Sequence, residues 1–162
     1  MSLTLPGNIW SPEDLKELIG DIERYARWLA DYSIKQRVSN SKLASQPPAL
    51  SAPAINLLHE LHAQHTLTTA SVDKLLADLQ AVDVIAPRIA FTFAAAPSNG
   101  LKKEFVSWCR DNISHDVLVS FNFKATILGG MVVRYGSHIY DWSFRRQILA
   151  SRDKFPEVLH HV

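Results

Sequence analysis

Residues 87–98 read PRIAFTFAAAPS, and at this stretch the pattern of the sequence changes. The apolar residues Ile89, Phe91 and Phe93 alternate with smaller ones, which is the period of a β-strand. Before Pro87 the apolar residues instead recur at steps of three and four, which predicts helices. Because helices come first and strands follow, the sequence predicts an α+β fold with two segregated parts.

The part before this change, residues 1–86, is predicted to be a bundle of three helices. Ser11 suits the N-cap of the first helix and Pro12 its first turn. The apolar repeat then continues to about Arg37, and Asp21 falls largely off the apolar stripe.

Two further helices are expected in this part, one from Pro53 and one capped by Thr69 or Ser71. The apolar positions of the second and third helices are Ile55, Leu58 and Leu61, then Val72, Leu75, Leu76, Leu79 and Val82. We expect one core to contain Leu15, Leu18, Ile22, Leu75 and Leu79.

The part from Pro87 onward, residues 87–162, is predicted to hold a mixed β-sheet and two helices. Strands are expected at 89–94 and 117–123, followed by a hairpin around Gly136-Ser137. Between the first two strands, Ser98 or Asn99 caps a helix whose expected inner face is Leu101, Phe105, Trp108, Cys109 and Ile113. A last helix is expected to start at Asp141-Trp142-Ser143 and to run to about Ala150.

Composition narrows the class of protein. The chain has 162 residues, with 47% hydrophobic and 20% charged residues, as in an ordinary globular protein. No apolar run approaches the ~18–20 residues needed to cross a bilayer, and the first residues lack the features of a signal peptide. One cysteine excludes an internal disulfide or a multi-cysteine metal site. We therefore expect a cytoplasmic protein without direct membrane insertion.

The net charge of +1 conceals an asymmetry between the two parts. Residues 1–86 hold 7 Lys and Arg against 10 Asp and Glu, whereas residues 87–162 hold 10 against 6. A modestly basic C-terminal half can face an acidic partner, but it is weakly charged for a protein that binds duplex nucleic acid.

The sequence offers no convincing catalytic, cofactor-binding or metal-binding residues. His59, His62 and His65 would spread over about 120° of a helix, so a solvated face is favoured over a metal site. Cys109 falls on the expected inner face of its helix, where a cysteine acts as a small apolar residue. Gly129-Gly130 lacks the spacing of a phosphate loop and favours a role in the backbone.

The most specific segment is residues 128–145, LGGMVVRYGSHIYDWSFR. It resembles the C-terminal signature of the delta subunit of F-type ATP synthase, the counterpart of the mitochondrial oligomycin-sensitivity-conferring protein. The signature residues are Gly129, Gly130, Arg134, Gly136, Asp141, Ser143 and Arg145. The resemblance covers about residues 87–150. It departs from the family at Trp142, where glycine is usual, and at Ser137, where an acidic residue is common. Family members also begin with six helices, whereas three are predicted here.

This resemblance implies a non-catalytic stator subunit, without cofactors, on the cytoplasmic face of the cell membrane. It would link the catalytic head to the peripheral stalk during proton-driven ATP synthesis. The N-terminal helices would receive the N-terminal segment of an alpha subunit, and Leu15, Leu18 and Ile22 are the candidate contacts. The C-terminal part would bind the C-terminal end of the stalk b subunits through Arg145 and Arg146.

Two other classes of function remain open from the sequence. A small nucleic-acid-binding module would use the basic C-terminal half, with Arg134, Arg145 and Arg146 as candidate contacts. A small enzyme would use Cys109 or the histidine cluster. A salt-dependent affinity for nucleic acid would favour the first, and a bound metal or a thiol of low pKa the second.

Overall fold

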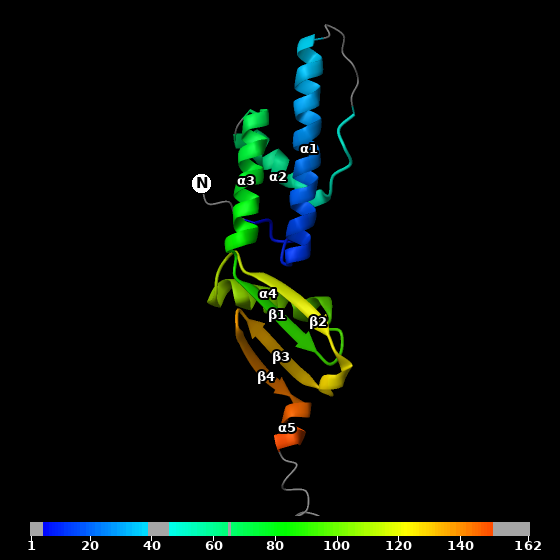
Figure 1. Cartoon of the computed structure of the whole chain (residues 1–162), viewed down its shortest axis with the longest axis vertical. Helices are drawn as coiled ribbons and strands as arrows, with labels where there is room; N and C mark the ends of the chain where they lie inside the picture. The colour runs from blue at the N-terminus through cyan, green and yellow to red at the C-terminus, as the bar shows by residue number, and fades with distance from the viewer. Residues whose placement is uncertain (1–4, 39–45, 65, 151–162) are drawn as a thin grey trace, which may run out of the picture. The chain divides into compact units, whose positions relative to one another are not determined.

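A computed structural model of the chain describes residues 5–38, 46–64 and 66–150. Its internal contacts divide the chain into two compact units, Met1–Ala86 and Pro87–Val162, at the boundary that the change of pattern predicts. The described part of the first unit is helical, and that of the second holds a four-stranded mixed sheet with helices (Figure 1). The predicted α+β fold is confirmed.

The N-terminal unit contains α1 (Pro12–Val38), α2 (Ala52–Gln64) and α3 (Thr69–Ile85). As predicted, Ser11 caps α1. Its Oγ accepts a hydrogen bond from the backbone N–H of Asp14 at 3.0 Å, and its own N–H donates to the Asp14 carboxylate at 3.1 Å. These reciprocal bonds satisfy donors that a helix start otherwise leaves unpaired.

The cap of α3 differs from the prediction by one residue. Thr68, not Thr69 or Ser71, is the N-cap, and its Oγ1 accepts from the N–H of Ser71 at 3.1 Å. Ser71 Oγ in turn accepts from the N–H of Thr68 at 2.9 Å. Ser71 therefore takes the third helical position of the cap, which the sequence of neighbouring hydroxyl residues left ambiguous.

The core of this unit lies mainly between α1 and α3. The five residues expected to form it are all buried: Leu15, Leu18, Ile22, Leu75 and Leu79. The prediction for α2 is partly wrong, because the helix buries Ala54, Leu57 and Leu58 while Ile55 is 42% exposed. The helix is short, and its apolar residues surround more than one face, so periodicity did not select the buried one.

The C-terminal unit contains β1 (Arg88–Phe93), α4 (Asn99–Asn112), β2 (Leu118–Phe123), a 3₁₀ turn η1 (Ala125–Ile127), β3 (Gly130–Tyr135), β4 (His138–Ser143) and α5 (Phe144–Ala150). The strand order is β2-β1-β3-β4. β1 pairs with β2 in parallel, which requires a crossover, and α4 supplies it. The pairs of β1 with β3 and β3 with β4 are antiparallel.

One face of this sheet is apolar over its whole width. The strand register aligns Phe91 with Phe121 on one side and with Val133 on the other, and Val133 with Tyr140. α4 packs on this face, where the ring of Phe105 lies 4.8 Å from that of Phe91 between centroids (Figure 1). Because paired residues lie on the same side of a sheet, the face on which α4 packs also includes Val133 of β3 and Tyr140 of β4.

The expected inner face of α4 is only partly correct. Val106 and Cys109 are its buried residues, whereas Trp108 is 57% exposed, and Leu101 and Ile113 are each 39% exposed. The helix carries two apolar stripes. The stripe with Val106 and Cys109 is buried, whereas the stripe with Leu101 and Trp108 is partly exposed. Ser98 caps the helix as predicted, with its Oγ accepting from the N–H of Leu101 at 3.3 Å.

The hairpin around Gly136-Ser137 is confirmed. Gly136 has a φ of 57° at the first central position of the two-residue turn, a conformation that suits glycine. The predicted start of the last helix is wrong, because Asp141, Trp142 and Ser143 belong to β4 and α5 begins at Phe144. Ser143 nevertheless precedes α5 and accepts a hydrogen bond from the N–H of Arg146 at 3.3 Å.

Candidate protein-docking site

An open apolar groove lies in the C-terminal unit between α4 and the strands β1, β3 and β4. It encloses about 560 Å³. Its lining residues are Ile89, Phe91, Leu101, Glu104, Phe105, Trp108, Ile113, Met131, Val133, Tyr135, Tyr140 and Trp142. Glu104 is the one charged residue among them, so the groove suits an apolar surface better than a charged ligand.

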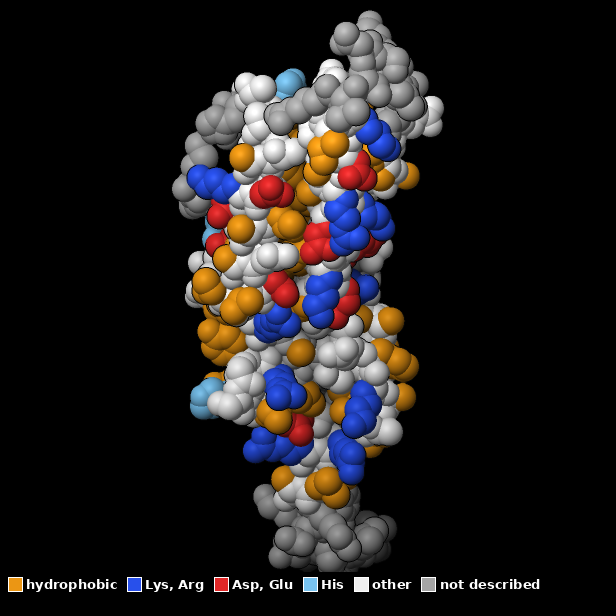
Figure 2. All heavy atoms as spheres, turned by 45° about the horizontal axis from the view of Figure 1, so that its top comes forward, with side chains coloured by type: hydrophobic (Ala, Val, Ile, Leu, Met, Phe, Trp, Pro, Cys, Tyr) orange, Lys and Arg blue, Asp and Glu red, His pale blue; other side chains and the backbone are white. Residues whose placement is uncertain are grey.

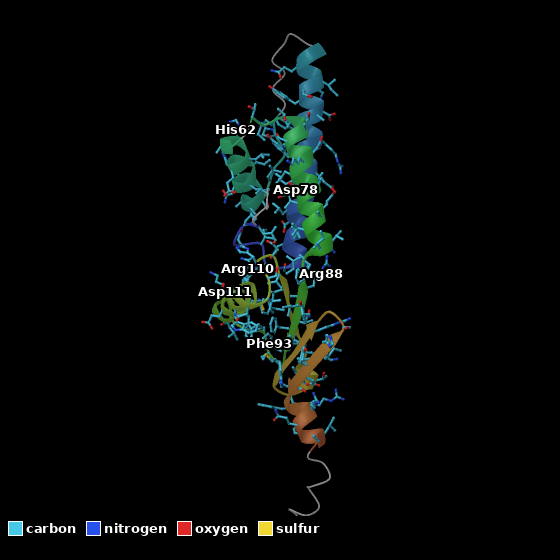
Figure 3. All side chains as sticks on the ribbon, turned by 90° about the vertical axis from the view of Figure 1, so that its left-hand side faces the viewer. His62, Asp78, Arg88, Phe93, Arg110 and Asp111 are labelled. Carbon is cyan, nitrogen blue, oxygen red and sulfur yellow. The ribbon has the colours of Figure 1, made fainter. Side chains whose placement is uncertain are left out.

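The groove exists because one helix covers part of the sheet. α4 joins β1 to β2 and packs on that half, where Phe105 contacts Phe91 and Phe93. Figure 3 shows α4, which carries Arg110 and Asp111, to one side of the strands. The apolar side chains of β3 and β4 on the same face have no such cover from the described residues of this unit, so they form the open wall.

Large aromatic side chains of the groove remain accessible to solvent. Trp108 is 57% exposed, Trp142 is 52% exposed and Tyr140 is 47% exposed. Tyr140 and Trp142 lie two residues apart on β4, and their rings stack with centroids 5.8 Å apart. Exposed apolar residues that gather in this way are typical of a surface that binds another protein.

The glycine pair of the signature has a structural role. Gly129 and Gly130 have φ values of +153° and +76°. A Cβ atom at Gly129 would overlap the ring of Phe144, and one at Gly130 would overlap the carbonyl of Trp142. The predicted role in the backbone is confirmed, since at each glycine a positive φ coincides with a close approach by another residue. The glycines let the start of β3 lie directly against the end of β4 and the start of α5.

Two polar residues of the signature, Asp141 and Ser143, are hydrogen-bonded to each other, and the neighbouring Arg146 bonds to Asp141. The Asp141 carboxylate accepts from the N–H of Ser143 at 2.9 Å, and the Arg146 guanidinium donates to the Asp141 carbonyl at 3.1 Å. The hydrogen bonds from Ser143 lower the pKa of Asp141, and the charges of Arg146 and Arg145 add to this effect. Asp141 is therefore an ionised, structural carboxylate.

The candidate partner residues fall into two groups. Arg145 and Arg146 are exposed on α5. Leu15, Leu18 and Ile22 are each no more than 1% exposed, so a partner would reach these side chains only if the helices separated. Arg134 is exposed on β3, on the face opposite the groove.

Cys109, His59 and His62 are the described residues among those considered for chemistry. Cys109 is buried, and burial raises the pKa of its thiol, so the thiolate is disfavoured. His59 and His62 are exposed, as expected for a solvated helix face, while His65 lies outside the described residues. Within residues 5–38, 46–64 and 66–150, no group of three or more His, Cys, Asp and Glu could hold a metal ion.

Sequence reasoning did not identify the groove. The available signal was the pair of apolar stripes on α4 together with the alternation of Tyr140 and Trp142 on the last strand. The prediction places the apolar residues of α4 on one inner face, Tyr140 in the hairpin and Trp142 at a helix start, because local patterns do not indicate how much of a sheet one helix covers.

The comparisons add no assignment beyond these observations. In the described part of the chain, no helix is long and apolar enough to cross a membrane. No protein-family model matches the chain, and no curated protein shows significant sequence similarity to it.

Proposed function

We propose that this protein is a non-catalytic stator subunit of an F-type ATP synthase, linking the catalytic head to the peripheral stalk. The observation that carries the proposal is the exposed apolar groove beside a segment that resembles the delta-subunit signature. The groove supports a role in binding proteins, and the resemblance of residues 128–145 supports this particular assembly.

A stator subunit acts by holding two parts of a complex at a fixed separation. In this proposal the C-terminal unit binds the C-terminal end of the stalk b subunits, and the N-terminal unit binds the N-terminal segment of an alpha subunit. Holding the head still lets the torque of the rotor change the conformation of the catalytic subunits. Such contacts have to dissociate slowly, and a nanomolar complex corresponds to about −12 kcal/mol.

The second half of α1 is the best candidate surface for the alpha-subunit segment. Tyr25, Trp28 and Tyr32 form an aromatic stack there. The rings of Tyr25 and Trp28 are tilted with centroids 5.5 Å apart, and those of Trp28 and Tyr32 are stacked at 5.3 Å. Each of the three is only partly buried. This aromatic stack replaces Leu15, Leu18 and Ile22 as the proposed contact, since those three side chains are buried in the core.

Co-purification tests this function directly. When the tagged chain is expressed in its native host and purified, we expect the alpha and b subunits to co-purify with it in a fixed stoichiometry. We expect them to remain bound after extensive washing. Recovery of the chain without either subunit would overturn the proposal. So would ATP hydrolysis by the pure chain that disappears in the His59→Ala variant.

The nucleic-acid-binding alternative rests on the positive charge of the C-terminal unit. Residues 87–150 hold 8 Lys and Arg against 4 Asp and Glu. Figure 2 shows Lys and Arg side chains gathered over the visible face of this unit. The groove itself contains no Lys or Arg among its lining residues, which favours a protein partner. An affinity for single-stranded RNA or DNA that falls steeply with added salt would support the alternative instead.

A further inference from the structure

The sheet of the C-terminal unit has room for a second helix beside α4. Adjacent strands lie about 4.8 Å apart, so β3 and β4 together present a strip about 10 Å wide. An α-helix with its side chains is also about 10 Å wide, and neighbouring helices pack 8–10 Å apart. One helix of the chain covers β1 and β2, and a helix from elsewhere fits over β3 and β4.

At the β4 edge of the sheet, side chains already bond to backbone groups that an added strand would need. The two-residue turn at Gly136-Ser137 makes Tyr135 and His138 a hydrogen-bonded pair, so the backbone groups of Asp141 and Ser143 point away from β3. The Arg146 side chain already occupies the Asp141 carbonyl, and the Asp141 carboxylate already occupies the Ser143 N–H. A strand added at β4 would have to displace these two bonds, which favours the face of the sheet over the β4 edge as the place to bind.

The charge of this unit indicates the chemistry of the partner. Its described residues 87–150 carry a net charge of +4, from 8 basic and 4 acidic side chains. Of these basic groups, Arg146 lies at the outer edge of β4, where its guanidinium donates to the Asp141 carbonyl, whereas the charged residue that lines the groove on α4 is Glu104. A helix bound over β3 and β4 would therefore be attracted through acidic residues on its flank at the β4 edge, and a basic flank there would be repelled.

We propose that the groove binds an amphipathic helix of a partner protein, with an apolar stripe facing the sheet and acidic residues along its flank at the β4 edge. A segment of about 14 residues, ~21 Å long, would match α4 in length. Trp108 on one wall and Tyr140 and Trp142 on the other would be its main contacts. This inference rests on the proposed function for the identity of the partner, while the groove defines the partner's chemistry.

A designed peptide tests this chemistry on the full chain. The probe has about 20 residues, with leucines at i, i+3, i+4 and i+7 and glutamates at most other positions. We expect micromolar binding and a shift of tryptophan emission to shorter wavelength, because Trp108 and Trp142 would leave water. A peptide of the same composition with its leucines scrambled, and one with lysine in place of glutamate, are expected to bind at least about tenfold more weakly.

A pair of neighbouring residues on β4 provides matched variants. Tyr140 points into the groove and Ile139, 64% exposed, lies on the opposite face of the same strand. Tyr140→Thr is expected to weaken peptide binding about tenfold or more, whereas Ile139→Thr leaves it unchanged. Trp108→Gln on α4 gives a second test from the other wall without altering the sheet. Circular dichroism confirms that each variant is folded.

The outcomes separate the groove from the proposed function. Equal binding of the three peptides, or equal effects of the two strand variants, would overturn the inference. Loss of self-association in the Tyr140→Thr variant would identify a second copy of the chain as the occupant and would also overturn it. If Tyr140→Thr still joins a stalk complex at full affinity, the groove inference fails while the stator function stands. If the peptide binds through Tyr140 but no ATP synthase subunit co-purifies, the stator function fails alone.

Discussion

At the scale of single residues, Asp21 is the most unusual side chain of the N-terminal unit. It lies in α1, is 1% exposed, and accepts a hydrogen bond from the N–H of Ser51 at 2.8 Å. The Arg24 guanidinium donates to the same carboxylate. Ser51 stands at the start of α2, where its carbonyl accepts from the N–H of Ile55. Asp21 therefore joins α1 to the beginning of α2 through a hydrogen bond.

Removal of this carboxylate is expected to destabilise the helical unit. Asp21→Ala would leave the partly buried N–H of Ser51 without its acceptor, and we expect the free energy of unfolding to fall by about 1–3 kcal/mol. Asp31→Ala, at an exposed position of the same helix, is expected to change it by less than about 0.5 kcal/mol. Urea unfolding followed by circular dichroism measures both, and equal effects would contradict the role of Asp21.

The same residue predicts a dependence on pH. Burial alone would raise the pKa of Asp21, but the hydrogen bonds from Ser51 and the charge of Arg24 outweigh it and lower the pKa. A lowered pKa in the folded state contributes stability above the unfolded value of about 3.9 and loses it as the pH falls through the folded pKa. As the pH is lowered from about 5 through the folded pKa of Asp21, the free energy of unfolding of the wild type is expected to fall. We expect it to fall less in the Asp21→Asn variant, as measured by urea unfolding at each pH.

The conformation of Gly130 predicts that a side chain added at this position lowers the stability of the fold. Valine there would combine a φ of +76° with a clash against the Trp142 carbonyl, so we expect a loss of about 1–3 kcal/mol or more. Arg134→Val places the same side chain at an exposed position of the same strand without positive φ, and is expected to be tolerated. Thermal unfolding of the two variants measures the difference, and similar melting temperatures would contradict the role of Gly130.

At the scale of elements, the packing of α3 against α1 predicts how much one buried residue of α3 contributes to the free energy of unfolding. Leu75 is 6% exposed, and Leu75→Ala is expected to lower the free energy of unfolding by about 2–5 kcal/mol. Its neighbour Leu76 is only half-buried, so Leu76→Ala controls for the change in helix composition and is expected to cost less. Denaturant unfolding checks the order, and a larger effect at Leu76 would contradict the packing of α3.

The short α5 is an element whose position depends on the signature. The N–H of Phe144 donates to the carbonyl of Gly129 at 3.0 Å, and the ring of Phe144 lies where a Cβ of Gly129 would be. Ser143 and Asp141 then hold Arg146 in place. The signature thus sets where the basic residues of α5 lie relative to the sheet.

At the scale of the whole molecule, the proposed stalk contact predicts an effect of salt. Arg145→Ala is expected to weaken binding of the stalk b subunits without unfolding the chain, and to do so more at low salt than at high salt. Lys16→Ala removes an exposed positive charge of α1, in the N-terminal unit, and serves as the control. Titration of purified stalk at two salt concentrations decides this, and unchanged affinity in Arg145→Ala would remove α5 from the contact.

Much of the fold follows from patterns between near neighbours in the sequence. The helix start at Ser11, the cap at Ser98, the hairpin at Gly136-Ser137 and the change from helices to strands near Pro87 were all predictable. Each depends on a few adjacent residues, through a capping hydrogen bond, a turn conformation or an apolar period. Local chemistry is therefore enough to predict these features.

The candidate site depends on contacts between residues that are far apart in sequence. Asp21 is buried because the chain brings Ser51 to it from 30 residues away, and no local period indicates that. Trp108 is exposed because α4 covers only half of the sheet, and Tyr140 borders the groove because β4 pairs with β3 at the uncovered edge. Apolar periodicity indicates which side chains tend to be buried. It does not indicate which element covers each of them, because packing between distant segments determines that.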